Sequence, residues 1–189
     1  MPVRLGETGR PAWPGSIADA RPAAVLVLVV PGVAEGDRGP ADVVLIERTT
    51  GGTHHSGEVS FPGGRAEAGD ADLVATALRE ANEEIGLDAA AADVRVVGTI
   101  EPFWIPVSNF SVTAVVAVAG RRPSLVASPD EVAAIVEAPL TAFVPPAPIE
   151  IVERDFREWR VRYGGYRIGE LHVWGATARI LGQLGAFLA

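Results

Sequence analysis

Three glutamates and one arginine lie close together near the middle of the chain, in residues 79–87 (REANEEIGL). An α-helix turns by about 100° per residue, so Glu80 and Glu84 are near neighbours on its surface and Glu83 flanks them. Like charges four residues apart cost roughly 0.2–0.5 kcal/mol per pair in an isolated helix, and something must offset that repulsion. Arg79 offsets part of it, and a divalent cation would offset more. Carboxylate oxygens are the ligands that Mg²⁺ prefers, so the segment is a candidate metal site, although three glutamates on a helix also occur as an ordinary solvated face.

The same segment carries the pattern of a helix that packs against a core. Apolar residues recur at helical spacing on roughly the opposite side from the glutamates: Val74, Leu78, Ala81 and Ile85. Asp70 is a suitable N-cap and Gly86 a suitable C-cap. We therefore predict a helix that starts near Asp70 and ends at Gly86, with its acidic face pointing away from the packing.

Alternating and apolar runs elsewhere predict strands at 24–30, 42–48, 94–101 and 110–120, and two more around 149–155 and 158–173. The last two bracket YGGY, which resembles a hairpin turn. A short extended piece at 58–62 precedes Gly63 and Gly64, and residues 131–140 lead into a connection. A closing helix is expected at 174–188, with an apolar stripe of Ile180, Leu184, Phe187 and Leu188. Strands outnumber helices without regular βαβ alternation, which favours an α+β fold with a mixed sheet sandwiched between helices.

Composition narrows the class of protein. A chain of 189 residues with 48% hydrophobic and 21% charged residues predicts one globular domain, here residues 23–189 after a flexible lead-in at 1–22. Without cysteine there can be no disulfide and no thiolate metal site. The longest apolar run is too short to span a membrane, and a net charge of −8 argues against broad nucleic-acid binding. We expect a soluble, cytoplasmic protein with neither a membrane nor a nucleic-acid partner; acidic side chains can still meet a small anionic ligand through bridging metal ions.

The acidic segment resembles the signature of the Nudix hydrolases, G-x5-E-x7-R-E-U-x-E-E-x-G-U, where U is aliphatic. Its second half matches at every fixed position: Arg79, Glu80, Ala81, Glu83, Glu84, Gly86 and Leu87. The first half is longer, because Gly64 lies fifteen positions before Arg79 where the general pattern has fourteen. Ala71 thus stands at the usual glutamate, with Asp70 and Asp72 on either side.

The longer spacing is similar to a branch of that family that cleaves coenzyme A, with H-x-G-x-V-x-F-P-G-G-x-x-D-x-x-D before A-L-R-E-x-x-E-E-I-G-L. The matching residues are His55, Gly57, Val59, Phe61, Pro62, Gly63, Gly64 and Asp70. Residues 172–181 (HVWGATARIL) also resemble the end of that branch. The branch often has Leu-Arg where this chain has Gly52-Thr53, so one basic residue is missing.

The resemblance implies a Nudix-like fold and hydrolysis of the diphosphate of coenzyme A or its derivatives, giving 3′,5′-ADP and 4′-phosphopantetheine. It implies Mg²⁺ or Mn²⁺ held by Glu80, Glu83 and Glu84, with Gly64 contributing through its backbone. Arg79 would pair with Glu83 or Asp72 and orient the ligands. Gly63 and Gly64 would let the backbone approach the metal or the diphosphate closely.

Further candidate residues lie outside the motif. Glu131 is a candidate general base or an ordinary turn residue, and His55 is a candidate substrate ligand or a loop histidine. Arg48 or Arg65 would meet the 3′-phosphate, and Phe103, Trp104 and Ile105 would line an apolar channel for the pantetheine arm or merely pack.

Two other functions stay open. One is a Nudix hydrolase of another nucleoside diphosphate derivative such as ADP-ribose, and the other is a non-catalytic module that binds nucleotide or metal. Relatives are often dimers, so a homodimer is also open.

Overall fold

The structure, a computed structural model, describes residues 4–5, 11–12, 17–33, 41–49, 58–106, 108–156 and 159–189. His55 and the Gly52-Thr53 pair lie outside the described residues, so their predicted roles stay predictions. β1 (Arg4–Leu5) and β2 (Pro11–Ala12) form a separate two-stranded sheet, and two 3₁₀ turns are η1 (Ile17–Asp19) and η2 (Leu140–Ala142). Within the residue ranges that the structure describes, no helix is both long and apolar enough to cross a membrane.

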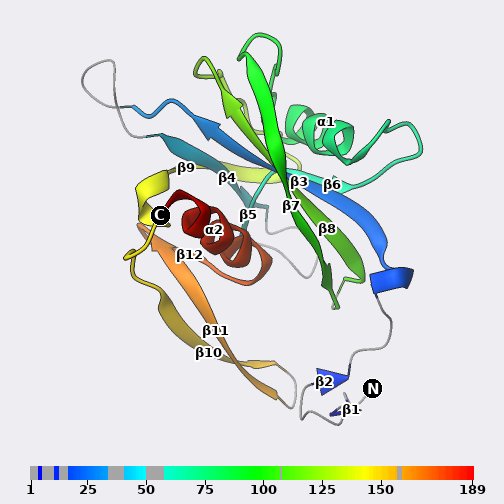
Figure 1. The fold of residues 1–189 in the computed structure, drawn as a ribbon, viewed down its shortest axis with the longest axis vertical. Coiled ribbons are helices and arrows are strands. Elements are labelled where there is room, and N and C mark those ends of the chain that lie inside the picture. Colours follow the sequence, from blue (N-terminus) through cyan, green and yellow to red (C-terminus); the bar gives the residue numbers. More distant parts are fainter. Residues whose placement is uncertain are drawn as a thin grey trace.

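A mixed sheet forms the centre of the fold (Figure 1). Its strands are β3 (Arg21–Val30), β4 (Asp42–Arg48), β5 (Val59–Ser60), β6 (Gly63–Arg65), β7 (Val94–Ile105), β8 (Phe110–Ala119) and β9 (Val132–Pro139). β3 pairs in parallel with β8, and the other pairs in the sheet are antiparallel. β3 pairs with β6 over residues 23–25 and with β4 only at residues 29–30, so the two long strands diverge and the short strands lie in the opening.

Strand alternation explains why both faces of this sheet are covered, because successive side chains point to opposite faces. On β3, Ala23 and Val27 enter one core, which α2 (Gly175–Leu188) closes. Leu26 and Leu28 enter the other core, which α1 (Leu73–Ile85) closes. The predicted α+β sandwich is confirmed.

The start of α1 differs from the prediction. The N-cap is Asp72, whose carboxylate accepts a hydrogen bond from the Ala75 amide at 2.8 Å. Asp70 is drawn instead to Thr76 and Arg79, which places it outside the helix. The predicted end is confirmed, because Gly86 adopts a left-handed conformation (φ 64°) that ends the helix.

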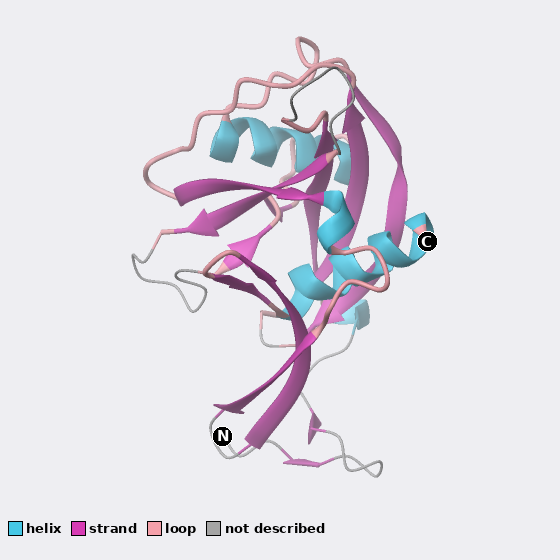
Figure 2. Cartoon of the chain, turned by 90° about the vertical axis from the view of Figure 1, so that its left-hand side faces the viewer, coloured by secondary structure: helices cyan, strands magenta, loops and turns pink. Residues whose placement is uncertain are grey.

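A second, antiparallel sheet contains β10 (Glu150–Phe156), β11 (Trp159–Ile168) and β12 (Leu171–Val173), and it projects beyond the main sheet in Figure 2. The predicted turn at YGGY is wrong, since residues 163–166 lie inside β11. A Cβ at Gly165 would lie 2.7 Å from Nε2 of His172, so this glycine makes room for a neighbouring side chain. The chain reverses instead near Gly169, which has a φ of 56°.

Two further expectations need correction. Residues 131–140 contain a full strand, β9, because they pair with β4 along its length. In α2, Ile180 and Leu184 are buried as predicted, but Phe187 and Leu188 are 80% and 50% exposed because the helix runs past the core.

Candidate active site

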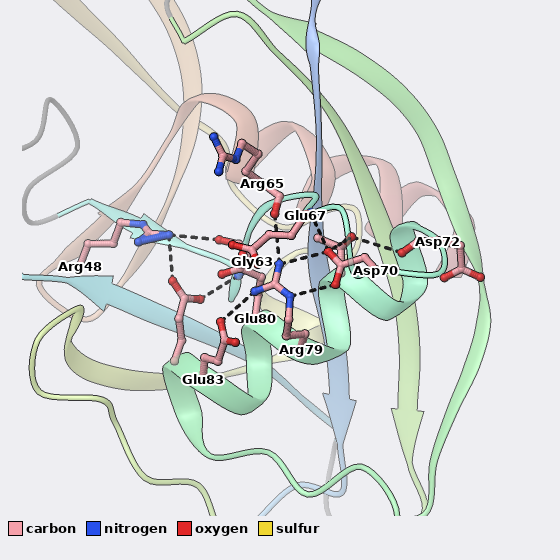
Figure 3. A network of polar contacts seen from close by, with 11 residues as sticks. Arg48, Gly63, Arg65, Glu67, Asp70, Asp72, Arg79, Glu80 and Glu83 are labelled. Atoms are coloured by element: carbon pink, nitrogen blue, oxygen red, sulfur yellow. Dashed lines mark hydrogen bonds and ion pairs between the residues drawn. The ribbon is translucent and has the colours of Figure 1, made fainter.

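Helix α1 packs on β3 and β6, which brings its acidic side against the Gly63–Arg65 strand (Figure 3). The sequence predicted that the acidic face points away from the packing. This is wrong for part of that face, which packs against β6. The side chain of Glu83 is 57% exposed, that of Glu80 is 15% exposed, and that of Glu84 is 1% exposed. The three carboxylates have three different surroundings.

Glu84 is held from two sides. Its Oε2 accepts a hydrogen bond from the Gly63 amide at 2.8 Å, and its Oε1 accepts one from Arg48 Nη2 at 3.0 Å. The same Arg48 nitrogen donates to the Gly63 carbonyl at 3.2 Å. Burial raises the pKa of Glu84 to about 7, against the opposing effect of Arg48 and Gly63, and repulsion from Glu80 and Glu131 adds to the rise.

Glu80 lies against the other glycine of the pair. A Cβ on Gly64 would be 2.6 Å from Oε1 of Glu80, so the carboxylate occupies the space that any side chain at 64 would fill. Burial raises the pKa of Glu80, while the hydrogen bond from Arg79 opposes the rise. Gly63 is constrained differently: its φ is 151°, and a Cβ there would lie 2.4 Å from the Ala24 carbonyl oxygen.

Arg79 links the helix to the loop before it. Its Nε and Nη2 donate to the two oxygens of Asp70 at 3.0 and 3.2 Å, and Nη1 donates to Glu83 at 2.8 Å. Nη2 also donates to Glu80 at 3.0 Å and to the Arg65 carbonyl at 3.1 Å. The predicted pairing with Glu83 is confirmed. The alternative partner, Asp72, caps the helix instead.

Asp70 is the principal partner of Arg79 in the loop before the helix, whereas the sequence reasoning assigned it as the helix cap. It also accepts hydrogen bonds from the Glu67 amide at 2.9 Å and from the Thr76 hydroxyl at 2.8 Å. The hydrogen bond from Arg79 holds the pKa of Asp70 well below its usual range. A signal was available, because Asp70 is next to Ala71, where the general signature has its first glutamate.

Comparison with known proteins agrees with this geometry. The sequence profile of the family described as NUDIX domain matches residues 21–160. The chain belongs to the Nudix hydrolase family. It is 36% identical over 180 residues to the Nudix hydrolase NudL of Citrobacter koseri, covering 93% of this chain and 86% of that protein. It is 38% identical over 165 residues to the mitochondrial Nudix hydrolase 15 of Arabidopsis thaliana, covering 84% of this chain and 55% of that protein.

The chain thus spans about half the length of the plant relatives that it matches. Solved Nudix structures share the fold. A C. elegans Ap4A hydrolase binary complex has a TM-score of 0.56 at 18% identity, covering 88% of this chain and 97% of that one. The M. smegmatis Nudix hydrolase RenU has a TM-score of 0.53 at 24% identity, covering 73% and 79%.

The Nudix site fits a divalent cation in charge and donor type. Four carboxylates, those of Asp70, Glu80, Glu83 and Glu84, face two guanidinium groups, those of Arg48 and Arg79, which leaves two negative charges in excess (4 − 2) when all are ionised. All the donors are oxygens, which suits Mg²⁺ or Mn²⁺. Among the described residues, however, no three acidic or histidine side chains converge on one point. Arg48 occupies one oxygen of Glu84, and Arg79 occupies one oxygen of Glu80 and one of Glu83.

The side chains of two further predicted site residues, Glu131 and Arg65, lie outside the network of Glu80, Glu83, Glu84 and the two arginines. Glu131 is exposed in the turn before β9, and repulsion from its charge is a minor cause, after burial, of the raised pKa of Glu80 and Glu84. The Arg65 side chain points away from the carboxylates in Figure 3.

The three candidates for an apolar channel do not share one face of β7. Phe103 is buried in the core that α2 closes, beneath Arg179, whose guanidinium carbon lies 4.5 Å from the ring centroid. Trp104 is the next residue on the strand, so it points to the opposite face, and its Nε1 donates to Asn109 at 3.0 Å. Phe103 and Trp104 therefore cannot line the same side of one channel.

Proposed function

We propose that this chain hydrolyses the diphosphate bond of a nucleoside diphosphate derivative with Mg²⁺ or Mn²⁺ as cofactor, and that coenzyme A or one of its derivatives is the substrate. The observation that carries the proposal is the buried Glu84 carboxylate, held at the Gly63 amide beside Glu80. Burying a carboxylate is costly, and at Glu84 one backbone amide and one partly exposed arginine offset that cost, so a divalent cation would stabilise this group further.

The roles follow from the contacts. Glu80, Glu83 and Glu84 hold the cation, and Gly64 keeps the space in which the Glu80 carboxylate lies. When bound, the cation neutralises charge on the diphosphate oxygens and lowers the pKa of a coordinated water. Arg79 is held in place by Asp70, and it orients Glu80 and Glu83 by donating a hydrogen bond to each of them. Glu131 is the candidate base, because it is an exposed carboxylate in the turn before β9, on the side of the fold where its charge acts weakly on Glu80 and Glu84.

Coenzyme A is preferred as the substrate because of the extended spacing between Gly64 and Arg79 and the HVWGATARIL segment. His55 would contact this substrate, and Trp104 would lie beside its pantetheine arm. The products would be 3′,5′-ADP and 4′-phosphopantetheine.

A second candidate, another nucleoside diphosphate derivative such as ADP-ribose, is favoured by one observation. Neither of the two arginines considered for the 3′-phosphate is positioned to bind it. Arg48 is bound to Glu84, and the Arg65 side chain points away from the carboxylates in Figure 3. A site without a cation for that phosphate gains nothing from coenzyme A over dephospho-coenzyme A.

The test is a comparison of kcat/KM on coenzyme A, dephospho-coenzyme A, ADP-ribose and a dinucleotide with Mg²⁺ or Mn²⁺, with product identification. We expect coenzyme A to be cleaved best and all turnover to stop in excess EDTA. If the 3′-phosphate gives no advantage and ADP-ribose is cleaved at least as well, coenzyme A is replaced by the broader class. Turnover that persists in EDTA rules out the metal mechanism, and a protein that binds Mn²⁺ but cleaves nothing is the non-catalytic module.

A further inference from the structure

Arg48 occupies the position of a cation at Glu84. It is the last residue of β4, and its side chain is 30% exposed while that of Glu84 is 1% exposed. One guanidinium nitrogen bridges the Glu84 carboxylate and the Gly63 carbonyl, at 3.0 and 3.2 Å. A positive charge thus already neutralises the most buried of the metal-binding glutamates.

The two oxygens of Glu84 differ in how readily they can change partners. Oε2 accepts from the Gly63 amide, and Gly63 belongs to β6, which is paired with the central strand β3. The donor of that bond is therefore on a backbone that sheet pairing holds in place. Oε1 accepts from a long side chain that reaches in from a strand end. A cation that approaches Glu84 therefore meets Arg48 at Oε1, and two positive charges cannot share that oxygen without strong repulsion.

We propose that Arg48 is a built-in counter-cation of Glu84, which the divalent cation displaces, and that the displaced guanidinium then binds the diphosphate of the substrate. This inference rests on the proposed function and adds an order of events to it.

The chemistry of arginine supports the second half of the proposal. A guanidinium has five N–H donors and matches phosphate oxygens in a two-pronged geometry. Both contacts of Arg48 described here use Nη2, so the group has more donors than Glu84 and Gly63 engage. Its contact with the Gly63 carbonyl also places it beside the Gly63-Gly64 pair, where the diphosphate is proposed to lie. Cation and substrate should then each raise the other's affinity, because binding free energies are reciprocally linked.

The first test measures Mn²⁺ affinity of the full chain by calorimetry or by electron paramagnetic resonance, without substrate. Arg48→Gln should bind Mn²⁺ at least threefold more tightly than wild type, because the competitor is gone. Arg65→Gln removes the same charge from a side chain that points away, and it should change the affinity less than twofold. In a Glu84→Gln background, Arg48→Gln should produce no gain. Arg48→Lys keeps the charge and should gain less than Arg48→Gln, which separates competition from loss of folding.

The second test uses α,β-methylene-ADP as a non-hydrolysable diphosphate. Mn²⁺ should tighten its binding to wild type, and that enhancement should be at least fivefold smaller in Arg48→Gln. Unchanged or weaker Mn²⁺ binding in Arg48→Gln overturns the inference, since Arg48 would then only hold Glu84 in place. An undiminished enhancement in that variant also overturns it. If wild type binds no Mn²⁺, the proposed function fails and the inference fails with it. If wild type binds Mn²⁺ but Arg48→Gln gains no affinity, the inference fails alone.

Discussion

Replacing Gly64 by alanine should damage the site while leaving the fold intact. The new Cβ would lie 2.6 Å from the Glu80 carboxylate, where ordinary contact begins at 3.4 Å, so the carboxylate must retreat by about 0.8 Å. A misplacement of about 1 Å at a catalytic group costs on the order of 10²-fold in rate, or about 2.7 kcal/mol of transition-state stabilisation. The carboxylate ends a flexible side chain, and Gly64 has no positive φ, so stability should change by no more than about 1 kcal/mol.

Gly63→Ala is the matched control, because it adds the same methyl group one residue earlier. Its Cβ would meet backbone atoms that cannot turn away, at 2.4 Å from the Ala24 oxygen and 2.5 Å from the Val25 Cα, in a residue with a φ of 151°. We expect a loss of roughly 3 kcal/mol or more in the free energy of unfolding.

Urea denaturation and steady-state turnover of both variants, on the substrate identified by the panel, separate the two effects. Gly64→Ala should unfold at nearly the wild-type urea concentration with turnover about 10²-fold lower. Full activity in Gly64→Ala, or a loss of stability as large as that of Gly63→Ala, would refute the idea that Gly64 is a glycine in order to leave room for the Glu80 carboxylate.

Three further changes test the network around Glu84 and Arg79. Glu84→Gln keeps the shape and removes the charge, so kcat should fall by roughly 10³-fold, as expected when several kcal/mol of cation-based stabilisation is lost; near wild-type turnover would contradict the role. Since burial raises the pKa of Glu84 from 4.5 to about 7, its stabilising contribution is complete below pH 4.5 and is lost as the pH rises through 7. Between pH 4.5 and 8, the unfolding free energy of the metal-free wild type should therefore fall by about 3 kcal/mol relative to Glu84→Gln, and parallel curves in urea titrations would count against it. Asp70→Asn weakens the two-pronged bond to Arg79, so kcat should fall about tenfold with little change in KM, whereas a change in KM alone would exclude an orienting role.

The elements that sequence reasoning located best are those whose residue pattern and packing agree. β4 was predicted with its observed bounds, because alternate residues enter the two cores on either side of the sheet. The end of α1 was likewise predictable, since a glycine that can adopt a positive φ follows the last apolar position.

Elsewhere, tertiary contacts decided against the local pattern. Residues 131–140 are rich in alanine and glutamate and show little alternation, yet they form β9 because β4 offers a complete pairing edge. Gly164 and Gly165 read as a turn, whereas in the fold their missing side chains make room for Ile149 and His172.

For the candidate site, the sequence grouped the candidate side chains but did not show what surrounds each of them. A helical projection groups Glu80, Glu83 and Glu84 on one side, yet it contains no information about the strand that covers Glu84. The choice of Asp70 over Asp72 as the partner of Arg79 also depends on the path of the loop, which places Asp70 against Thr76.

The attachment of the glycine pair to the central strand has a consequence for how this protein would be inactivated. From Pro62 to Ala66 the loop is hydrogen-bonded along β3, ending in bonds from Leu26 to the Pro62 carbonyl and from Ala66 to the Pro22 carbonyl. The amide that holds Glu84 is therefore on a backbone segment that is fixed to the central strand β3. Heat or denaturant should abolish catalysis and melt the sheet in a single cooperative event, with no folded but inactive species accumulating on the way, and slow amide exchange at Gly63 would report on both at once.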